Sequence, residues 1–265
     1  MAIYTGVADA NGDFNIPFST NYTGGQKVTV TAEKDGATKS IELFAPSDTT
    51  GGGVIQFSGT LANFPNNIGG IVLSEISGAI GDYAFNSANS GEIWANATSL
   101  VIPPGITSIG NYAFMAWSGS TSVSIPEGVT AIGNNAFMNW TNLLSIILPS
   151  TLLTIGANAF SSASKVTSLV IPNSVTSIGN SAFFSYAQLL SLTIGSSVVS
   201  IGSQAFQGLS ACNEIICLQA TPPTIQSNTF NGLKATCIIK VPAASVSAYQ
   251  AAPNWSAYAA RIQAI

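Results

Sequence analysis

The sequence is poor in charged side chains. Only 7% of its 265 residues are Asp, Glu, Lys or Arg, and the formal net charge is −4, whereas about a quarter of the residues of a typical globular domain are charged. Between Ile93 and Asn213 the only charged residues are Glu127 and Lys165. Nucleic-acid binding requires several Lys or Arg side chains that neutralise phosphates. We therefore expect no nucleic-acid partner.

Histidine is absent, which removes the commonest general base and any Ser-His pair. Glycoside hydrolysis usually needs two neighbouring carboxylates, but after Glu127 the next acidic residue is Glu214. The glycines follow a repeat and do not form a phosphate-binding loop. We expect no catalytic residue, no cofactor and no enzymatic activity.

Cysteine is scarce: Cys212, Cys217 and Cys237 are the only three. An odd number without CxxC spacing provides no metal-binding framework, so we expect no metal site. The cysteines are interpreted as small buried hydrophobic residues, with a Cys217–Cys237 bridge as the alternative.

Long apolar runs are missing as well. No run is long enough to cross a bilayer, so we expect no membrane insertion. Residues 1–9 lack the basic start and apolar centre of a signal peptide. Either the protein is not exported by that route, which we favour, or a signal has been removed from it.

What the sequence does contain is a repeated phrase, Ile-Gly-x-x-Ala-Phe. Its copies begin at Ile80, Ile109, Ile132, Ile155, Ile178 and Ile201. The step is 23 residues throughout from Ile109 to Ile201 and 29 residues before Ile109, and a weaker copy, Ile225 to Phe230, follows. A strict period in this range predicts a solenoid, in which each coil stacks on its neighbours.

Alignment on this step gives apolar columns. One column holds Leu100, Val123, Ile146, Leu169, Leu192 and Ile215, and a second lies two residues further on. A spacing of two is the period of a β-strand, so both columns face one side. We expect the Gly of the phrase to permit a tight bend and the Phe residues to stack inside the solenoid.

The fold class that follows is an α/β repeat solenoid, mostly β, with parallel strands. The predicted parts are a small antiparallel β module at 1–46, a glycine-rich linker at 47–53, the solenoid at 54–242 and a short helical cap at 243–265. Strands of the module are expected at 15–18, 27–32 and 40–44. In the cap, Trp255, Tyr258 and Ile262 are expected to turn inward.

The repeats resemble the BspA-like, or Treponema pallidum-type, leucine-rich repeats. The phrase Leu-x-x-Ile-x-Leu-Pro, as in Leu143 to Pro149, followed by Ile155 to Phe160, carries the resemblance. It covers about residues 68–242 and implies a curved, parallel-stranded solenoid with a role in adhesion at bacterial surfaces and no catalytic residues. The slot three residues after the Phe is commonly Cys or a small residue in that family. Here it holds Trp117, Trp140, Ala163, Tyr186 and Leu209, and Trp94 is the equivalent residue of the first coil, displaced by the six extra residues of the 29-residue step.

Two sets of residues are candidate ligand-binding positions. The rings of Trp94, Trp117, Trp140 and Tyr186 either fill gaps between coils or form a partly exposed ladder that offers ring faces to a carbohydrate. The outward strand positions include Ser122, Ser145, Ser168 and Ser191 in one column, beside a second column with Val101, Ile147 and Val170. These positions form either a solvated sheet face or an uncharged docking surface for a sugar or a protein.

The predicted function is non-enzymatic recognition. The first residues are weakly similar to the β modules of some bacteriophage tail and fibre proteins, and a virion protein needs no export signal. The first hypothesis is therefore a phage tail-fibre or receptor-binding component of the virion. Its N-terminal module would attach to other virion proteins, and its solenoid would bind a bacterial surface carbohydrate or protein. The alternatives are a secreted or cell-surface BspA-like adhesin of a bacterium, and a purely structural virion protein.

Overall fold

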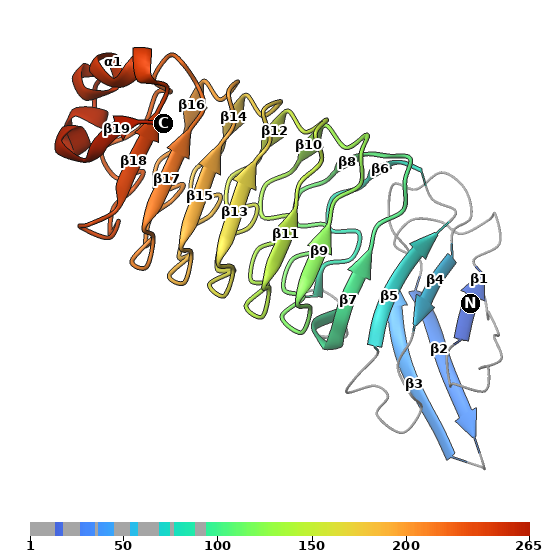
Figure 1. Ribbon diagram of the computed structural model, residues 1–265. Coiled ribbons are helices and arrows are strands. Elements are labelled where there is room, and N and C mark those ends of the chain that lie inside the picture. The colour runs from blue at the N-terminus through green and yellow to red at the C-terminus, as the bar shows by residue number, and fades with distance from the viewer. Residues whose placement is uncertain are drawn as a thin grey trace.

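The protein forms an elongated solenoid of parallel strands in the computed structural model (Figure 1). The structure describes residues 14–17, 27–34, 37–44, 54–57, 69–74, 77–87 and 94–265. Most coils contribute one strand to each of two sheet faces that run along the solenoid. The predicted fold class is confirmed.

The first face contains the longer strand of each coil. The strands are β5 (Gly69–Ser74), β7 (Ala97–Val101), β9 (Ser122–Ser124), β11 (Ser145–Ile147), β13 (Ser168–Ile171), β15 (Ser191–Ile194), β17 (Glu214–Cys217) and β18 (Ile238–Val241). In the register of β13 with β15, Ser168 lies opposite Ser191. Residues 23 apart are therefore lateral neighbours, and each sequence column becomes a row across the sheet.

The second face consists of short strands that contain the repeated Ile. They are β6 (Gly78–Ile80), β8 (Ile106–Ile109), β10 (Ala131–Ile132), β12 (Thr154–Ile155), β14 (Ser177–Ile178) and β16 (Ser200–Ile201). All pair in parallel with their neighbours, for example Ile132 with Ile155. The 3-10 helix η2 (Trp94–Asn96) precedes β7.

The core is a continuous stack of phenylalanine rings. The stack consists of Phe85, Phe114, Phe137, Phe160, Phe183, Phe206 and Phe230, all buried. Adjacent ring centroids are 5.0–5.6 Å apart with interplanar angles of 2–14°. Each ring is thus covered by the rings of its neighbouring coils, as expected from the sequence. A single coil could not shield its own ring.

The repeated glycine has a different reason from the expected one. A Cβ atom built at Gly156 would lie 2.6 Å from the carbonyl carbon of Gly133 in the preceding coil, and the Gly156 N–H donates to the carbonyl of Ile132 at 2.8 Å. Neither glycine is among the residues with positive φ. The chain does turn directly after Gly156, but glycine is required because successive backbones approach so closely that no side chain fits between them.

The first described strands extend this architecture with antiparallel pairs. The strands β2 (Lys27–Lys34) and β3 (Ala37–Phe44) form a two-stranded sheet of their own. The strand β1 (Phe14–Pro17) pairs with β4 (Val54–Phe57), which pairs with β5, so both join the first sheet of the solenoid. The predicted linker at 47–53 lies outside the described residues, and the domain boundaries stay predictions.

A cap closes the C-terminal end. It consists of η3 (Ala243–Ser245), α1 (Val246–Ala251), η4 (Trp255–Arg261) and the strand β19 (Ile262–Ala264), which pairs in parallel with β18. The indole Nε1 of Trp255 donates to the carbonyl of Pro223 at 2.7 Å, and the Tyr249 hydroxyl donates to the carbonyl of Gln219 at 2.8 Å. Trp255 and Ile262 are buried, and Tyr258 packs partly buried against the core. None of the helices in the described ranges is both long and apolar enough to span a bilayer.

Candidate functional site

The predicted serine column lies in one row on the outer side of the first sheet. Ser122, Ser145 and Ser168 are exposed, and Ser191 is half-buried. The Ser191 hydroxyl donates to Oγ of Ser168 at 3.2 Å. The 23-residue step places one hydroxyl on each strand, so the row follows the length of the solenoid. We call the outward side chains of the strands β7, β9, β11, β13, β15, β17 and β18, with the residue before each of these strands, the strand face.

Large aliphatic side chains stand beside these serines. Six of the ten large hydrophobic side chains that are exposed in the described part of the chain belong to the strand face. They are Val101, Leu144, Ile147, Val170, Leu190 and Ile238, with exposed fractions from 37% to 61%. Contiguous exposed apolar groups on a folded protein mark a surface that binds something. Leu144 and Leu190 were not singled out from the sequence, because they precede the strands and fall outside the alternating pattern.

A shallow hollow of about 620 Å³ lies on this face around Ile147 and Val170. Glu127 stands at its edge, and its carboxylate accepts hydrogen bonds from the backbone N–H of Ser150 at 2.9 Å and from the Ser150 hydroxyl at 3.0 Å. The backbone N–H of Ser150 is the main cause of a lowered pKa at Glu127. The hollow therefore has an apolar floor and one carboxylate that is already engaged by its neighbouring coil.

The predicted aromatic ladder is buried. The exposed fraction is 2% for Trp94 and 0% for Trp117, Trp140 and Tyr186. Of the two interpretations, the one in which these rings fill the gaps between coils is correct, and the exposed ladder is wrong. These side chains offer no ring face to a carbohydrate in this structure.

Packing and hydrogen bonding explain why these rings are inside. Trp117 lies between Trp94 and Trp140 at centroid distances of 5.4 and 5.8 Å, and it meets Phe114 edge to face. Its Nε1 donates to the carbonyl of Phe85 at 2.7 Å, and the Nε1 of Trp140 donates to the carbonyl of Phe114 at 2.6 Å. Each indole thereby satisfies a backbone carbonyl that would otherwise be buried without a partner.

A different aromatic pair is on the surface. The rings of Tyr83 and Tyr112 stack with centroids 4.7 Å apart at an interplanar angle of 5°, and Tyr83 is 50% exposed. Both have left-handed backbone, with φ of 60° and 58°. Sequence reasoning missed this pair. The signal was available, since the equivalent positions of later coils hold Asn135, Asn158, Ser181 and Gln204, a polar column typical of an exposed position.

The second sheet carries a longer groove of about 750 Å³ along β8 to β16. The repeated glycines form its floor, and an amide row lines it. Oδ1 of Asn111 accepts from the N–H of Asn134 at 2.8 Å, and Oδ1 of Asn134 accepts from the N–H of Ala157 at 2.7 Å. The repeated glycines are explained by the close approach of the coils. The asparagine amides are explained by the hydrogen bonds that they accept from the backbone of the next coil. The groove is a consequence of coil stacking.

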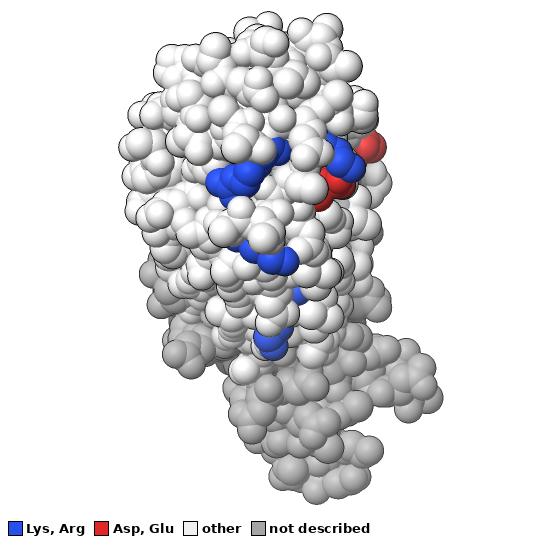
Figure 2. Space-filling view, turned by 60° about the vertical axis from the view of Figure 1, so that its left-hand side comes forward, with Lys and Arg blue, Asp and Glu red and all other residues white. Residues whose placement is uncertain are grey.

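The surface is mainly uncharged. The face in Figure 2 shows a few separate basic and acidic groups on a large neutral surface. Among the described residues there is no group of three or more His, Cys, Asp or Glu that could hold a metal ion. The groups that the strand face presents are mainly hydroxyl and aliphatic side chains.

Comparison with known proteins identifies the repeats. The family described as "BspA type Leucine rich repeat region (6 copies)" matches residues 78–213 and 176–252. No curated protein matches the chain.

Several solved structures are similar to this chain at low identity. The pneumococcal vaccine antigen PcpA is 23% identical with a TM-score of 0.49, over 61% of this chain and 38% of that one. This chain thus spans well under two thirds of the length of that protein. The T. pallidum leucine-rich repeat protein is 22% identical with a TM-score of 0.44, over 54% and 83% of the two chains. A leucine-rich repeat protein from Bacteroides ovatus is 21% identical with a TM-score of 0.31, over 63% and 52%.

Proposed function

Because the chain belongs to the family of BspA-type leucine-rich repeats, we propose that it is a non-enzymatic recognition protein that acts as an adhesin at a bacterial cell surface. In this proposal the strand face is the binding surface. Repeat solenoids bind partners over such extended surfaces, and the family's association with adhesion supports the same role.

The observation that carries the proposal is the exposure of Ile147 and Val170 side by side around the hollow of the strand face. Their exposed fractions are 61% and 58%. Core positions of the same strands, such as Leu169, are nearly completely buried. Since the core is already filled, these aliphatic side chains gain nothing from folding, and a partner that covers them would remove their apolar surface from water.

The chemistry of this face favours a protein partner over a carbohydrate. Sugar recognition by stacking needs accessible aromatic rings, and the tryptophans of the repeat column are buried. Aliphatic side chains interspersed with serine hydroxyls fit an uncharged apolar surface of a protein. The partner is therefore proposed to be a protein on a neighbouring bacterial or host cell.

The virion hypothesis receives no support from the comparisons. The family match begins at residue 78, whereas that hypothesis rested on residues 1–46 and on the absence of a recognisable signal peptide. The alternative drawn from the sequence, a secreted or cell-surface adhesin, agrees better with the family and replaces it.

The test is binding of the labelled protein to intact bacterial and host cells. The cells are used untreated, after protease treatment and after glycosidase treatment. We expect binding to selected cell types that is lost after protease treatment. Loss only after glycosidase treatment would assign the face to a carbohydrate, and no binding to any cell type would contradict the adhesin proposal.

Matched variants locate the binding surface. The double variant Ile147→Asp, Val170→Asp places two charges in the hollow, and Val199→Asp places one at a side chain that is 63% exposed outside the strand face. We expect the double variant to bind about ten-fold more weakly or worse, with an unchanged unfolding midpoint, and the control to bind normally. Equal binding by all three proteins would exclude the strand face.

A further inference from the structure

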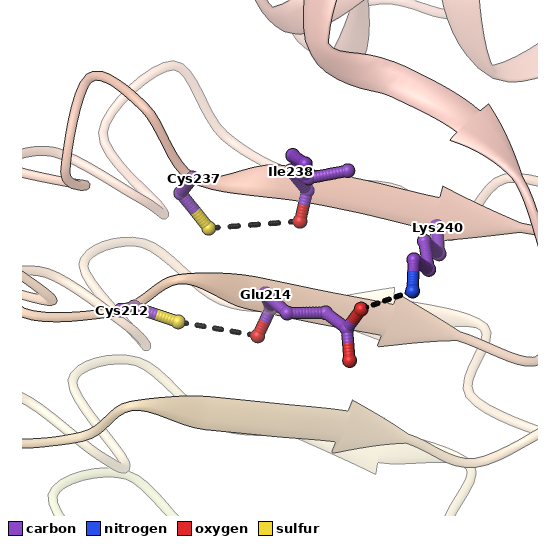
Figure 3. Close-up of polar contacts among 5 residues, drawn as sticks. All are labelled: Cys212, Glu214, Cys237, Ile238 and Lys240. Atoms are coloured by element: carbon purple, nitrogen blue, oxygen red, sulfur yellow. Dashed lines mark hydrogen bonds and ion pairs between the residues drawn. The ribbon is translucent and has the colours of Figure 1, made fainter.

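Two cysteines meet at the last coil of the solenoid. Cys212 lies two residues before β17 and Cys237 lies directly before β18; each is the last buried residue ahead of its strand, and the two strands pair in parallel as neighbours. Figure 3 shows their side chains at the beginnings of these two strands. The Cys212 thiol donates to the carbonyl of Glu214 at 3.3 Å, and the Cys237 thiol donates to the carbonyl of Ile238 at 3.7 Å, so both sulfurs are held at the beginnings of these neighbouring strands. The alternative drawn from the sequence, a Cys217–Cys237 bridge, does not fit this arrangement.

The spacing suits a covalent bond. Neighbouring strands of a sheet are about 4.8 Å apart, and disulfides join residues whose Cα atoms are roughly 4.4–6.8 Å apart. The Asn213 carbonyl accepts the N–H of Ile238 at 3.0 Å, which holds the two strand beginnings together. Cys217 lies at the other end of β17, far along the strand from Cys212. Its partner on β15 is Ile194, and on the side of β18 the pairing ends one residue earlier, at Ile216 and Lys240.

The two cysteines lie at the end of the regular coils, where a covalent bond would stabilise the last coil. In three preceding coils the position equivalent to Cys212 holds Leu143, Val166 and Leu189, all buried. The change to sulfur occurs only where the regular coils end. The last coil of a solenoid has a full coil on one side only, so unfolding can begin there. Polar contacts already fasten this end: Lys240 forms an ion pair with Glu214 (Figure 3), and Arg261 of the cap donates to the carbonyl of Lys234 at 2.9 Å.

We propose that Cys212 and Cys237 form a disulfide bond that joins β17 to β18 and locks the last coil under the C-terminal cap. The oxidant is a small-molecule disulfide such as oxidised glutathione, which reacts while the chain is folding and both thiols are accessible. The thiolate of Cys212 attacks one sulfur of the oxidant, whose S–S bond breaks, and the released thiolate takes up a proton. The sulfur of Cys237 then gives up its proton and attacks the Cys212 sulfur of the mixed disulfide, which releases a second thiol. The two protein thiols have lost two hydrogens, and the oxidant has become two thiols.

The surroundings favour this order of attack. The neighbouring Cys237 side chain lowers the pKa of Cys212, and the neighbouring Cys212 side chain raises the pKa of Cys237. Burial in an apolar environment raises the pKa of Cys217 to about 12. The thiolate is the reactive form of cysteine, so these pKa shifts make Cys212 the first nucleophile once β17 and β18 have paired during folding, and they leave Cys217 unreactive.

The experiment refolds the full chain with oxidised and reduced glutathione, and then counts free thiols in denaturant and maps the linked peptides by mass spectrometry. The three free thiols of the reduced chain are expected to fall to one, Cys217, with Cys212 and Cys237 in a single intramolecular link. Three remaining thiols, a link through Cys217, or a disulfide-bonded dimer on a non-reducing gel would each overturn the proposal.

Variants and thermal unfolding test the purpose of the bond. The oxidised protein is expected to melt several degrees higher than the reduced protein. Cys212→Ala and Cys237→Ala should abolish this difference, and Cys217→Ala should keep it. The same melting temperature with and without reductant in the cross-linked natural sequence would show that the bond does not stabilise the last coil, which would overturn its locking role.

Discussion

The interior of the coils and the strand face obey the same 23-residue step but differ in how strictly they repeat. Inside, the position of Phe160 holds Phe in every coil from Phe85 to Phe230. On the strand face, the column of Ile147 also holds Val101, Ser124, Val170, Thr193 and Ile216. The interior repeats because each ring must fit against the same ring above and below it. The face varies because no neighbour in the chain constrains it, which leaves it available for a partner.

The aromatic column shows the limit of that rule. It changes from Trp140 to Ala163 to Tyr186. Variation of this kind is typical of exposed positions. All three positions are nevertheless completely buried. Interior positions can vary when neighbouring layers compensate for volume, so variation by itself does not indicate exposure.

Removing interior rings should have the largest effect. Trp117→Ala and Phe160→Ala each delete a completely buried ring, and each should lower the free energy of unfolding by about 3–5 kcal/mol. Trp117→Ala also leaves the Phe85 carbonyl without its indole donor. Denaturant titration measures the loss, and a change below about 1 kcal/mol would place the ring outside the core.

Placing a side chain between neighbouring backbones should have the next largest effect on stability. Gly156→Ala introduces a Cβ 2.6 Å from the Gly133 backbone, so the coils must separate, and a loss of about 3 kcal/mol is expected. Ser177→Ala, in the same groove, is the matched control and should change stability by less than about 0.5 kcal/mol. Similar values for the two variants would refute the close approach as the reason for glycine.

Relieving a strained position should stabilise the protein. Ala116 has φ of 68°, and the equivalent positions near the C-terminus hold Gly208 and Gly232 with φ of 91° and 77°. Ala116→Gly should therefore raise the free energy of unfolding by about 0.5–1 kcal/mol. The reverse change, Gly208→Ala, should lower it. Destabilisation by both changes would show that this column does not require left-handed backbone.

The smallest effect concerns pH. The pKa of Glu127 is lowered from its ordinary value of 4.5 by the hydrogen bond from Ser150, so the folded state favours the carboxylate. Its contribution to stability is present above the unfolded-state pKa and is lost as the pH falls through the lower folded-state pKa. Glu127→Gln should reduce stability slightly at neutral pH, and the difference from the natural sequence should vanish in acid. A difference independent of pH would contradict this linkage.

Much of the fold could be predicted because it depends on spacing. The period gave the parallel register, the Phe stack and the apolar columns, since residues one period apart must become neighbours in a solenoid. The sequence left the burial of Trp117 as one of two interpretations, because it depends on the distance between the strand and the Phe stack and on the Phe85 carbonyl that accepts the indole N–H. The Cys212–Cys237 contact was missed because the last coil departs from the 23-residue step. The exposed serines were placed correctly, whereas the hollow beside them arises from the side chains of several adjacent coils together.

The most direct test of this account is a parallel measurement of stability and cell binding for two variants. Trp117→Ala changes the interior, and the double variant Ile147→Asp, Val170→Asp changes the strand face. We expect Trp117→Ala to lower the unfolding midpoint strongly and, at a temperature where it is still folded, to bind cells like the natural protein. The double variant should keep the midpoint and lose binding. If Trp117→Ala instead kept the midpoint and lost binding while the double variant bound normally, the assignment of interior and binding face would be contradicted.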